Sequence, residues 1–270
     1  MTQDLAQGVN ARGRAKIGAR TLRTDRWWLA PVLTVTGLTL WVIYAVVRAS
    51  MQSDYFVPAY HYLSPFSSPC LSDSCVAGSS LFGTPFGAWP PLIPFAILTL
   101  PFLLLFRLSC YYYRKAYYRS YWQSPPACAV AEPHKKYTGE TRAPLILQNA
   151  HRYFWYAAVI ISLINTWDAV EAFHGKGGGI GFGLGTLIMV VNVVLLWGYT
   201  LGCHSCRNIT AGRLTHFSRH PIRYGLWQQV SRLNAHHMGF AWATLASLVV
   251  TDLYIALVAG GAFSDFRFFN

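Results

Sequence analysis

Cysteine and histidine side chains that could bind a metal ion are concentrated at four places in the sequence. They are Cys110, His151, the group Cys203, His204 and Cys206 in "GCHSC", and the pair His236 and His237. Each place lies at the end of a long apolar run. Thiolates and imidazoles are the ligands of zinc and iron–sulfur centres, and a pair of imidazoles can hold a haem. The sequence therefore predicts a metal centre if the apolar runs bring these residues together.

The apolar runs are long enough to cross a lipid bilayer. Hydrophobic residues make up 53% of the chain and charged residues 12%, which is far from the balance of a soluble domain. Windows of about twenty apolar residues, the length of a bilayer-spanning helix, occur near 27–47, 88–109, 152–173, 180–202 and 237–259. Because lipid offers the backbone no hydrogen-bond partners, all five should be helices. The predicted fold class is an all-α integral membrane protein.

The positions of Lys and Arg predict the orientation of this bundle. Residues 1–26 carry six of them, 107–152 carry eight and 203–236 carry five, whereas the opposite side has only Arg48, Lys176 and Arg267. Short basic loops stay in the cytoplasm, so we expect the N-terminus inside and the C-terminus outside. The formal charge of +12 then reflects topology and anionic lipid rather than nucleic acid. All the clustered cysteines and histidines fall at the cytoplasmic ends of spans two to five.

The domain organisation follows from the same pattern. We expect a basic cytoplasmic segment (1–26), a transmembrane bundle (27–259) with an outer loop (48–87), and a short outer tail (260–270). The outer loop contains "PCLSDSC". On the oxidising side of the membrane, this spacing predicts a disulfide between Cys70 and Cys75, with a metal site as the alternative.

The ligand chemistry leaves several centres open. Cys203 and Cys206, at i and i+3, can share one helix face, whereas only one of the neighbours His236 and His237 need face inward. Two imidazoles could hold a b-type haem; two thiolates with two imidazoles could hold Zn²⁺ or a Rieske-type [2Fe–2S] cluster. Zinc would crosslink the helices of the bundle, whereas the iron–sulfur cluster would transfer electrons. Taken singly, each cysteine or histidine could also be structural.

Two carboxyl side chains lie deeper in the predicted spans. Asp168 and Asp252 follow His151 and His237 towards the outer leaflet. An ionisable residue within a membrane span is a functional hypothesis by default. The two residues could relay protons; the alternatives are pairing with Arg48 or exposure at the outer interface.

Three longer stretches carry a resemblance to a known family. They are "SCYYYRKAYYRSYWQSPPACAVAEPHKKYTGETRAPLILQNAHRYFWY" (109–156), "GCHSCRN" (202–208) and "NAHHMGFAW…TDLY" (234–254). Together they resemble the membrane subunit of a haemless, five-span class of succinate dehydrogenase. The resemblance implies a Rieske-type [2Fe–2S] cluster within the membrane, bound by Cys110, His151, Cys203 and His237, with Cys206 and His236 as second choices. It also implies flavoprotein and iron–sulfur subunits docked on the cytoplasmic face.

The expected function is therefore that of a membrane-anchor and electron-transfer subunit of succinate:quinone oxidoreductase (respiratory complex II) in the bacterial inner membrane. Such a chain passes electrons to menaquinone or ubiquinone, is not catalytic alone, and could belong to a higher oligomer of the whole complex. The run "YYYRKAYYRSYW" (111–122) reads as an interfacial aromatic belt or as a platform for the iron–sulfur subunit. The alternatives are a b-type haem anchor of a related oxidoreductase, or a structural or transport protein with a zinc or disulfide staple.

Overall fold

Long apolar helices dominate the computed structural model, which describes residues 23–90, 92–130, 141–143 and 145–270. In that part of the chain, three helices are long and apolar enough to cross a membrane: α2 (Leu29–Met51), α6 (Leu184–Leu201) and α9 (His237–Ala259). They coincide with predicted spans one, four and five. The predicted helical membrane protein is confirmed at this level, whereas the count of five spans and their orientation remain predictions.

The other two predicted spans are not among these three helices. α5 (His151–Glu171) matches the third span but carries a row of buried polar residues. The second span, expected over 88–109, is helical only as a 3₁₀ turn (Phe95–Leu98) followed by α3 (Leu100–Ser109). Pro90 and Pro94 precede these elements and Pro101 lies in the first turn of α3. Proline lacks the N–H that a helix interior needs, so α3 begins late.

Short polar helices follow the apolar ones. α4 (Tyr111–Ser120) comes directly after α3, α7 (His204–Ala211) comes after α6, and a 3₁₀ turn (Phe217–Arg219) leads into α8 (Pro221–Ala235). None of the residues of α8 is fully buried. The basic residues of 1–22 and part of the basic segment 107–152, namely 131–140 and 144, lie outside the described residues.

The chain divides into two units. Unit 1 comprises Met1–Val42 and Leu108–Ala150, and unit 2 comprises Ile43–Arg107 and His151–Asn270. Within unit 1, the hydroxyls of Thr39 and Tyr121 lie 2.6 Å apart, which ties the first part of α2 to the chain just after α4. The Tyr117 hydroxyl donates to the Leu108 carbonyl at 2.8 Å.

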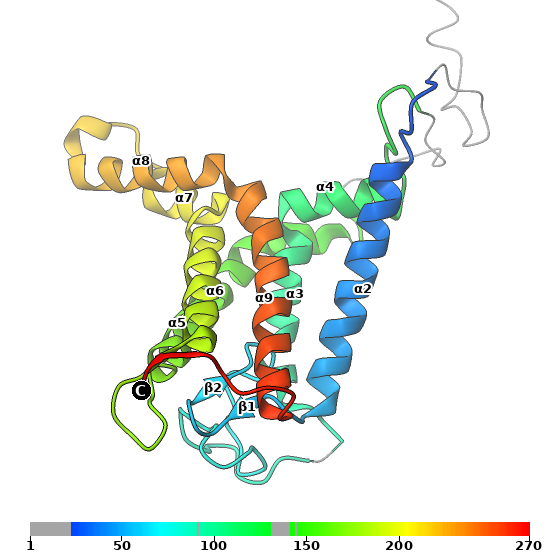
Figure 1. Ribbon diagram of the computed structural model, residues 1–270. Helices are drawn as coiled ribbons and strands as arrows, with labels where there is room; N and C mark the ends of the chain where they lie inside the picture. Colours follow the sequence, from blue (N-terminus) through cyan, green and yellow to red (C-terminus); the bar gives the residue numbers. More distant parts are fainter. Residues whose placement is uncertain (1–22, 91, 131–140, 144) are drawn as a thin grey trace, which may run out of the picture. The chain divides into compact units, whose positions relative to one another are not determined.

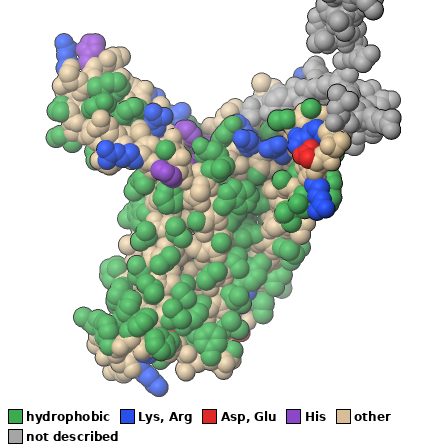
Figure 2. Space-filling view, turned by 45° about the horizontal axis from the view of Figure 1, so that its top comes forward, with side chains coloured by type: hydrophobic (Ala, Val, Ile, Leu, Met, Phe, Trp, Pro, Cys, Tyr) green, Lys and Arg blue, Asp and Glu red, His purple; other side chains and the backbone are tan. Residues whose placement is uncertain are grey.

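Unit 2 is built on α5, α6 and α9. α6 packs against both α5 and α9, as Figure 1 shows. Because α5 and α9 run opposite to α6, the starts of α5 and α9 and the end of α6 meet at one end, here called the histidine end after His151 and His237. Figure 2 shows hydrophobic side chains over the sides of the bundle, and His side chains with part of the basic side chains towards α7 and α8. Apolar side surfaces of this kind suit contact with lipid.

The opposite end, here called the disulfide end, is covered by the loop that follows α2. A two-stranded antiparallel sheet, β1 (Phe56–Val57) and β2 (Tyr62–Leu63), packs there against α9 and α5. Cys70 and Cys75 form a disulfide with Cα atoms 6.2 Å apart, the pair that the sequence spacing predicts. Cys70 is buried together with Tyr55, Phe56 and Phe95, so the loop has an apolar core of its own.

The C-terminal tail completes the disulfide end. β4 (Arg267–Phe269) pairs with β3 (Phe182–Gly183), which leads directly into α6. Tyr62, which is fully buried, connects the loop to this tail: its hydroxyl donates to Asp265 Oδ2 at 2.8 Å and accepts from Arg267 at 2.8 Å. The ring fits against Gly185, where there is no side chain to obstruct it.

Candidate functional site

Three of the predicted ligands lie at the histidine end of unit 2. His151 is the first residue of α5, His237 is the first residue of α9, and Cys203 lies between α6 and α7. The Nε2 atom of His151 and the Sγ atom of Cys203 are 3.1 Å apart. The exposed fraction is 0% for Cys203 and 1% for His237. A buried thiol and a buried imidazole therefore lie near a second, partly exposed imidazole, and the three side chains come from three helix ends.

Aromatic rings fix the orientation of both imidazoles. The Phe106 ring stacks on His151 with centroids 5.0 Å apart, and the Tyr199 ring stacks on His237 with centroids 4.8 Å apart. The two aromatic rings also touch each other, at 5.2 Å. Arg107 lies over Tyr199 at 5.1 Å and donates to Thr244 Oγ1 at 3.0 Å. This packing places each imidazole in one ring plane before any metal is bound.

The chain bends at Gly202 and Cys203, which corrects the sequence-based prediction. The end of the fourth span and "HSC" were expected to form one helix face carrying Cys203 and Cys206. Instead, α6 ends at Leu201 and Cys203, in an extended conformation, caps α7 and accepts a hydrogen bond from the Ser205 N–H at 3.3 Å. Asn234 stabilises the bend by donating to the Gly202 carbonyl at 2.7 Å.

A side chain at Gly202 would not fit beside His237. A Cβ atom there would lie 3.3 Å from His237 Nδ1 and 2.7 Å from the Gly198 carbonyl. The absence of a side chain thus lets α9 approach the bend that carries Cys203. The same contact shows that His237 lies next to the "GCHSC" segment.

The second-choice ligands are less well placed. His236 is exposed, and its Nδ1 lies 3.2 Å from the Arg232 carbonyl, so of the two neighbours only His237 faces the interior. Cys206 is buried in α7, and burial raises the pKa of its thiol while Thr210 lowers it. A raised pKa disfavours the thiolate that a metal requires.

The remaining predicted ligand, Cys110, belongs to unit 1. It is 2% exposed and precedes the first residue of α4. Within the described residues, no group of three or more His, Cys, Asp or Glu side chains is close enough together to hold a metal ion. The residues of unit 2 by themselves supply the donor types of a mixed thiolate–imidazole centre, not a complete site.

Asp252, one of the two predicted proton-relay residues, is paired with a cation. Its carboxyl group accepts from Arg48 Nε at 2.7 Å and from the hydroxyls of Ser64 and Tyr44, both at 2.5 Å. The alternative of an Arg48 partner, raised by the sequence, is thus what the structure contains for Asp252. Asp168 is also buried, at 2% exposed, and accepts a hydrogen bond from Ser68.

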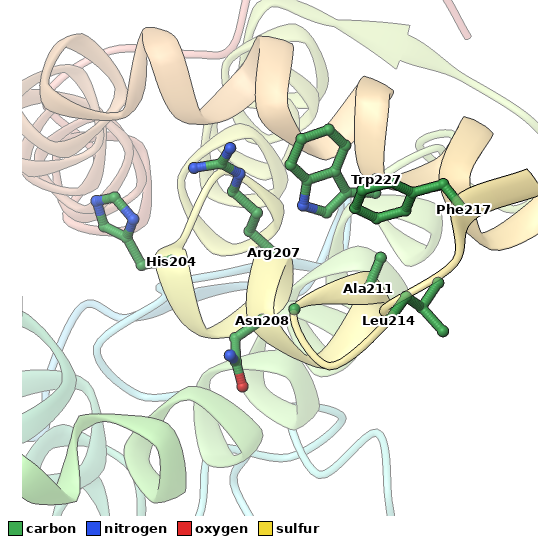
Figure 3. A pocket seen from close by; sticks show the side chains of 8 residues that line it. His204, Arg207, Asn208, Ala211, Leu214, Phe217 and Trp227 are labelled. Atoms are coloured by element: carbon green, nitrogen blue, oxygen red, sulfur yellow. The ribbon is translucent and has the colours of Figure 1, made fainter.

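A separate pocket of about 380 Å³ lies between α7 and α8 (Figure 3). Its wall includes His204, Arg207, Phe217 and Trp227. The Arg207 guanidinium lies 4.8 Å from the centre of the Trp227 ring, and its Nε donates to Ser231 at 3.1 Å. The His204 ring is 6.4 Å from that of His237, so this pocket adjoins the histidine end. The sequence did not predict this pocket, because α8 contains no long apolar run from which a helix could be expected.

The long apolar helices, together with a thiol and two imidazoles at one end of them, define the class: a helical membrane protein that carries the donor types of a metal centre. Comparison with known families is more specific: residues 29–261 match the family of the actinobacterial succinate dehydrogenase subunit SdhC. The chain belongs to this family. It is therefore a non-catalytic subunit of an enzyme complex, associated with the other succinate dehydrogenase subunits and with the bacterial inner membrane, which it crosses more than once.

A solved structure supports this assignment. A chain of the Mycobacterium smegmatis Sdh1 complex in the apo form is 65% identical to this one, with a TM-score of 0.88. The match covers 95% of this chain and 97% of the other. Among curated protein sequences there is no significant match.

Proposed function

We propose that this chain is the membrane-anchor and electron-transfer subunit of a succinate:quinone oxidoreductase and that its histidine end holds a Rieske-type [2Fe–2S] cluster. The observation that carries the proposal is the contact of the partly exposed His151 with the buried Cys203, beside the buried His237. Thiolates together with imidazoles are the donor set of such a cluster. The proposed ligands are Cys110, His151, Cys203 and His237, with Cys206 and His236 in reserve.

The residues of unit 2 suit this group chemically. When bound, the cluster would supply one-electron transfer. The N–H of Ser205 donates to Cys203 Sγ, and hydrogen bonds to the sulfurs are one of the features that set the potential of an iron–sulfur centre. The rings of Phe106 and Tyr199 stack on the two imidazoles and hold them in place. Outer residues that orient metal ligands in this way increase metal affinity.

The partners follow from the proposed orientation. With the histidine end on the cytoplasmic side, flavoprotein and iron–sulfur subunits would dock there, and the quinone, menaquinone or ubiquinone, would come from the bilayer. α4 offers a basic and aromatic surface for the iron–sulfur subunit: Tyr111 is half exposed and Arg114 lies over its ring at 5.5 Å. The predicted five spans and a higher oligomer of the whole complex belong to the same proposal.

A double substitution tests the proposed ligands. In the purified complex, His151→Ala with His237→Ala should remove the EPR signal of the reduced Rieske-type cluster and stop quinone reduction. Succinate oxidation with an artificial acceptor should continue, because that reaction occurs in the soluble subunits. His236→Ala is the matched control, since His236 is the exposed neighbour, and it should retain both signal and activity.

The spectra also separate the rival centres. A Soret band would indicate haem, and zinc without an EPR signal would indicate a structural staple. Retention of both the EPR signal and quinone reduction in the double variant would show that the two histidines are not ligands.

A further inference from the structure

Asp168 is a buried carboxyl group that has no basic partner among the described residues. The described part of the chain contains three buried carboxyl side chains, Asp168, Asp252 and Asp265. Asp252 is paired with Arg48, and Asp265 with Arg267. For Asp168, by contrast, the hydrogen-bond donor within the described ranges is the hydroxyl of Ser68. Because an isolated carboxylate is costly to bury, such a group takes up a proton instead.

A small cavity adjoins Asp168 inside the bundle. It is lined by Asn165 and Asp168 of α5, by Asn192 and neighbouring residues of α6, and by Thr251 of α9, and the loop closes it with Leu63 and Pro65. Its volume, measured for the centre of a water-sized sphere, is about 10 Å³. That is close to the least volume that can hold one water molecule, which also needs between two and four polar partners.

Two polar atoms of this cavity have no hydrogen-bond partner in the part of the chain that the structure describes. They are Asp168 Oδ1 and Thr251 Oγ1, and both residues are at least 98% buried, with exposed fractions of 2% and 1%. Buried polar atoms are nearly always satisfied by protein or by an ordered water. A single water molecule in this cavity would serve both atoms at once.

The charged groups around Asp168 do not neutralise it. Glu171, one turn further along α5, lies 3.5 Å from His61 Nδ1, and His61 stacks on His174 with centroids 4.0 Å apart. His61 and Glu171 are both partly exposed. On α9, Asp252 follows Thr251 but is held by Arg48. Two titratable side chains, His61 and Glu171, thus lie between the surface of the disulfide end and Asp168.

A stripe of polar side chains continues from Asp168 towards the histidine end. On α5, Ser162, Asn165 and Asp168 recur at three-residue spacing and are all buried, so they share one face. Ser162 Oγ lies 3.2 Å from Thr200 Oγ1 of α6. Asp168 to Ser162 spans about 9 Å along the helix.

The stripe also includes α9. Ser247 donates to Asn192 Oδ1 at 2.7 Å. One turn further on, Thr244 accepts from Arg107, which lies over the ring of Tyr199. Tyr199 in turn stacks on His237. Hydroxyl and amide groups therefore line the interior between the two ends of unit 2.

We propose that a water molecule bridges Asp168 and Thr251, and that this water and the protonated Asp168 form a proton-transfer site between the surface of the disulfide end and the polar stripe. The role of this site in proton delivery rests on the proposed function, quinone reduction by the complex. Reduction of a quinone to a quinol takes up one proton for each electron; the electrons come from succinate, which is oxidised to fumarate. The site would deliver protons for that uptake.

Infrared spectroscopy of the purified complex tests the site without reference to activity. The wild-type complex should show the C=O stretch of a buried protonated carboxyl group, shifted in D₂O, and Asp168→Asn should remove it. Thr251→Val keeps the shape of the side chain but removes the hydroxyl, so the band should shift. Thr251→Ser restores the hydroxyl and should restore the wild-type band.

Kinetics test the proposed use of the site. Asp168→Asn should slow quinone reduction by about tenfold or more, as expected for loss of a proton donor, and Thr251→Val should slow it by about threefold, with Thr251→Ser near wild type. Succinate oxidation by an artificial acceptor and the EPR signal should not change. A wild-type complex without the carboxyl band, or an Asp168→Asn complex that reduces quinone at the normal rate, would overturn the inference. A carboxyl band present in a complex without any iron–sulfur signal from this chain would instead contradict the proposed cluster alone.

Discussion

A methyl group added at Gly185 should disrupt the disulfide end of the bundle. Gly185 lies in the first turn of α6, and a Cβ atom there would lie 2.3 Å from Cε2 of Tyr62 and 2.8 Å from Cδ2 and Cζ. Carbon atoms normally approach to between about 3.5 and 4.0 Å. The overlap is therefore about 1 Å, with the edge of a rigid ring.

Tyr62 cannot easily move away. Its hydroxyl is bonded to Asp265 and Arg267 at 2.8 Å and lies 3.1 Å from Thr186 Oγ1, and the side chain is fully buried. Overpacking of a filled interior costs about 1–3 kcal/mol. Replacing glycine by alanine in a helix returns up to about 1 kcal/mol. Gly185→Ala should therefore lower the free energy of unfolding by about 1–2 kcal/mol.

Thermal unfolding of the purified complex measures this effect, with a thiol-reactive dye reporting exposure of the buried Cys203 and Cys206. The midpoint for Gly185→Ala should fall by about 2–4 °C for each kcal/mol. Gly239→Ala, also within a helix but with no atom within 4 Å of the added Cβ, is the matched control and should not lower the midpoint. Equal midpoints for Gly185→Ala and wild type would show that Tyr62 does not hold this end rigidly.

Three further predictions concern the same end of unit 2. Cys70→Ser should reduce stability by about 2 kcal/mol, the chain-entropy value for so small a loop; in wild type, a thiol reagent should label neither Cys70 nor Cys75 until reductant is added, and labelling without reductant would exclude the disulfide. Asp252→Asn should destabilise the complex by about 3–5 kcal/mol, since it leaves Arg48 buried without its anion, and a second substitution, Arg48→Met, should recover part of the loss in the thermal midpoint; no recovery would mean that the pair is not coupled. Burial and, more weakly, Asp265 raise the pKa of Tyr62 to about 12, above the value of about 10 in an unfolded chain. Stability should therefore be intact below pH 10 and decrease as the pH rises from about 10 to 12, a decrease that Tyr62→Phe should reduce.

The helices that the sequence predicts well are those defined by long apolar runs. α6 and α9 were expected over 180–202 and 237–259 and are found at Leu184–Leu201 and His237–Ala259. The second span was predicted too long, because a hydropathy window does not register that prolines interrupt backbone hydrogen bonding. α8 was missed, because its polar residues give no hydropathy signal and none of its residues is fully buried.

The sequence was sufficient to predict which residue types form the candidate site, but not how these residues are arranged in space. Histidines at the starts of α5 and α9 and a cysteine after α6 were sufficient to expect a cluster at one end. Sequence alone could not select His237 over His236, because that depends on the rotation of α9 about its axis. The bend at Gly202 depends on the donation from Asn234, a residue more than thirty positions away, and no local pattern reports such a contact.

The ion pair between Arg48 and Asp252 has a consequence for biogenesis. Only Ala45 and Ala49 of α2 are buried, so the bond of Arg48 to Asp252, 204 residues further along the chain, is a principal attachment of the C-terminal part of this helix. At about 5–20 residues per second, the ribosome needs roughly 10–40 s to reach that partner. During this interval α2 carries an unneutralised guanidinium near its end, which must remain in the hydrated headgroup region. α2 is thus fixed in place only after α9 has been made.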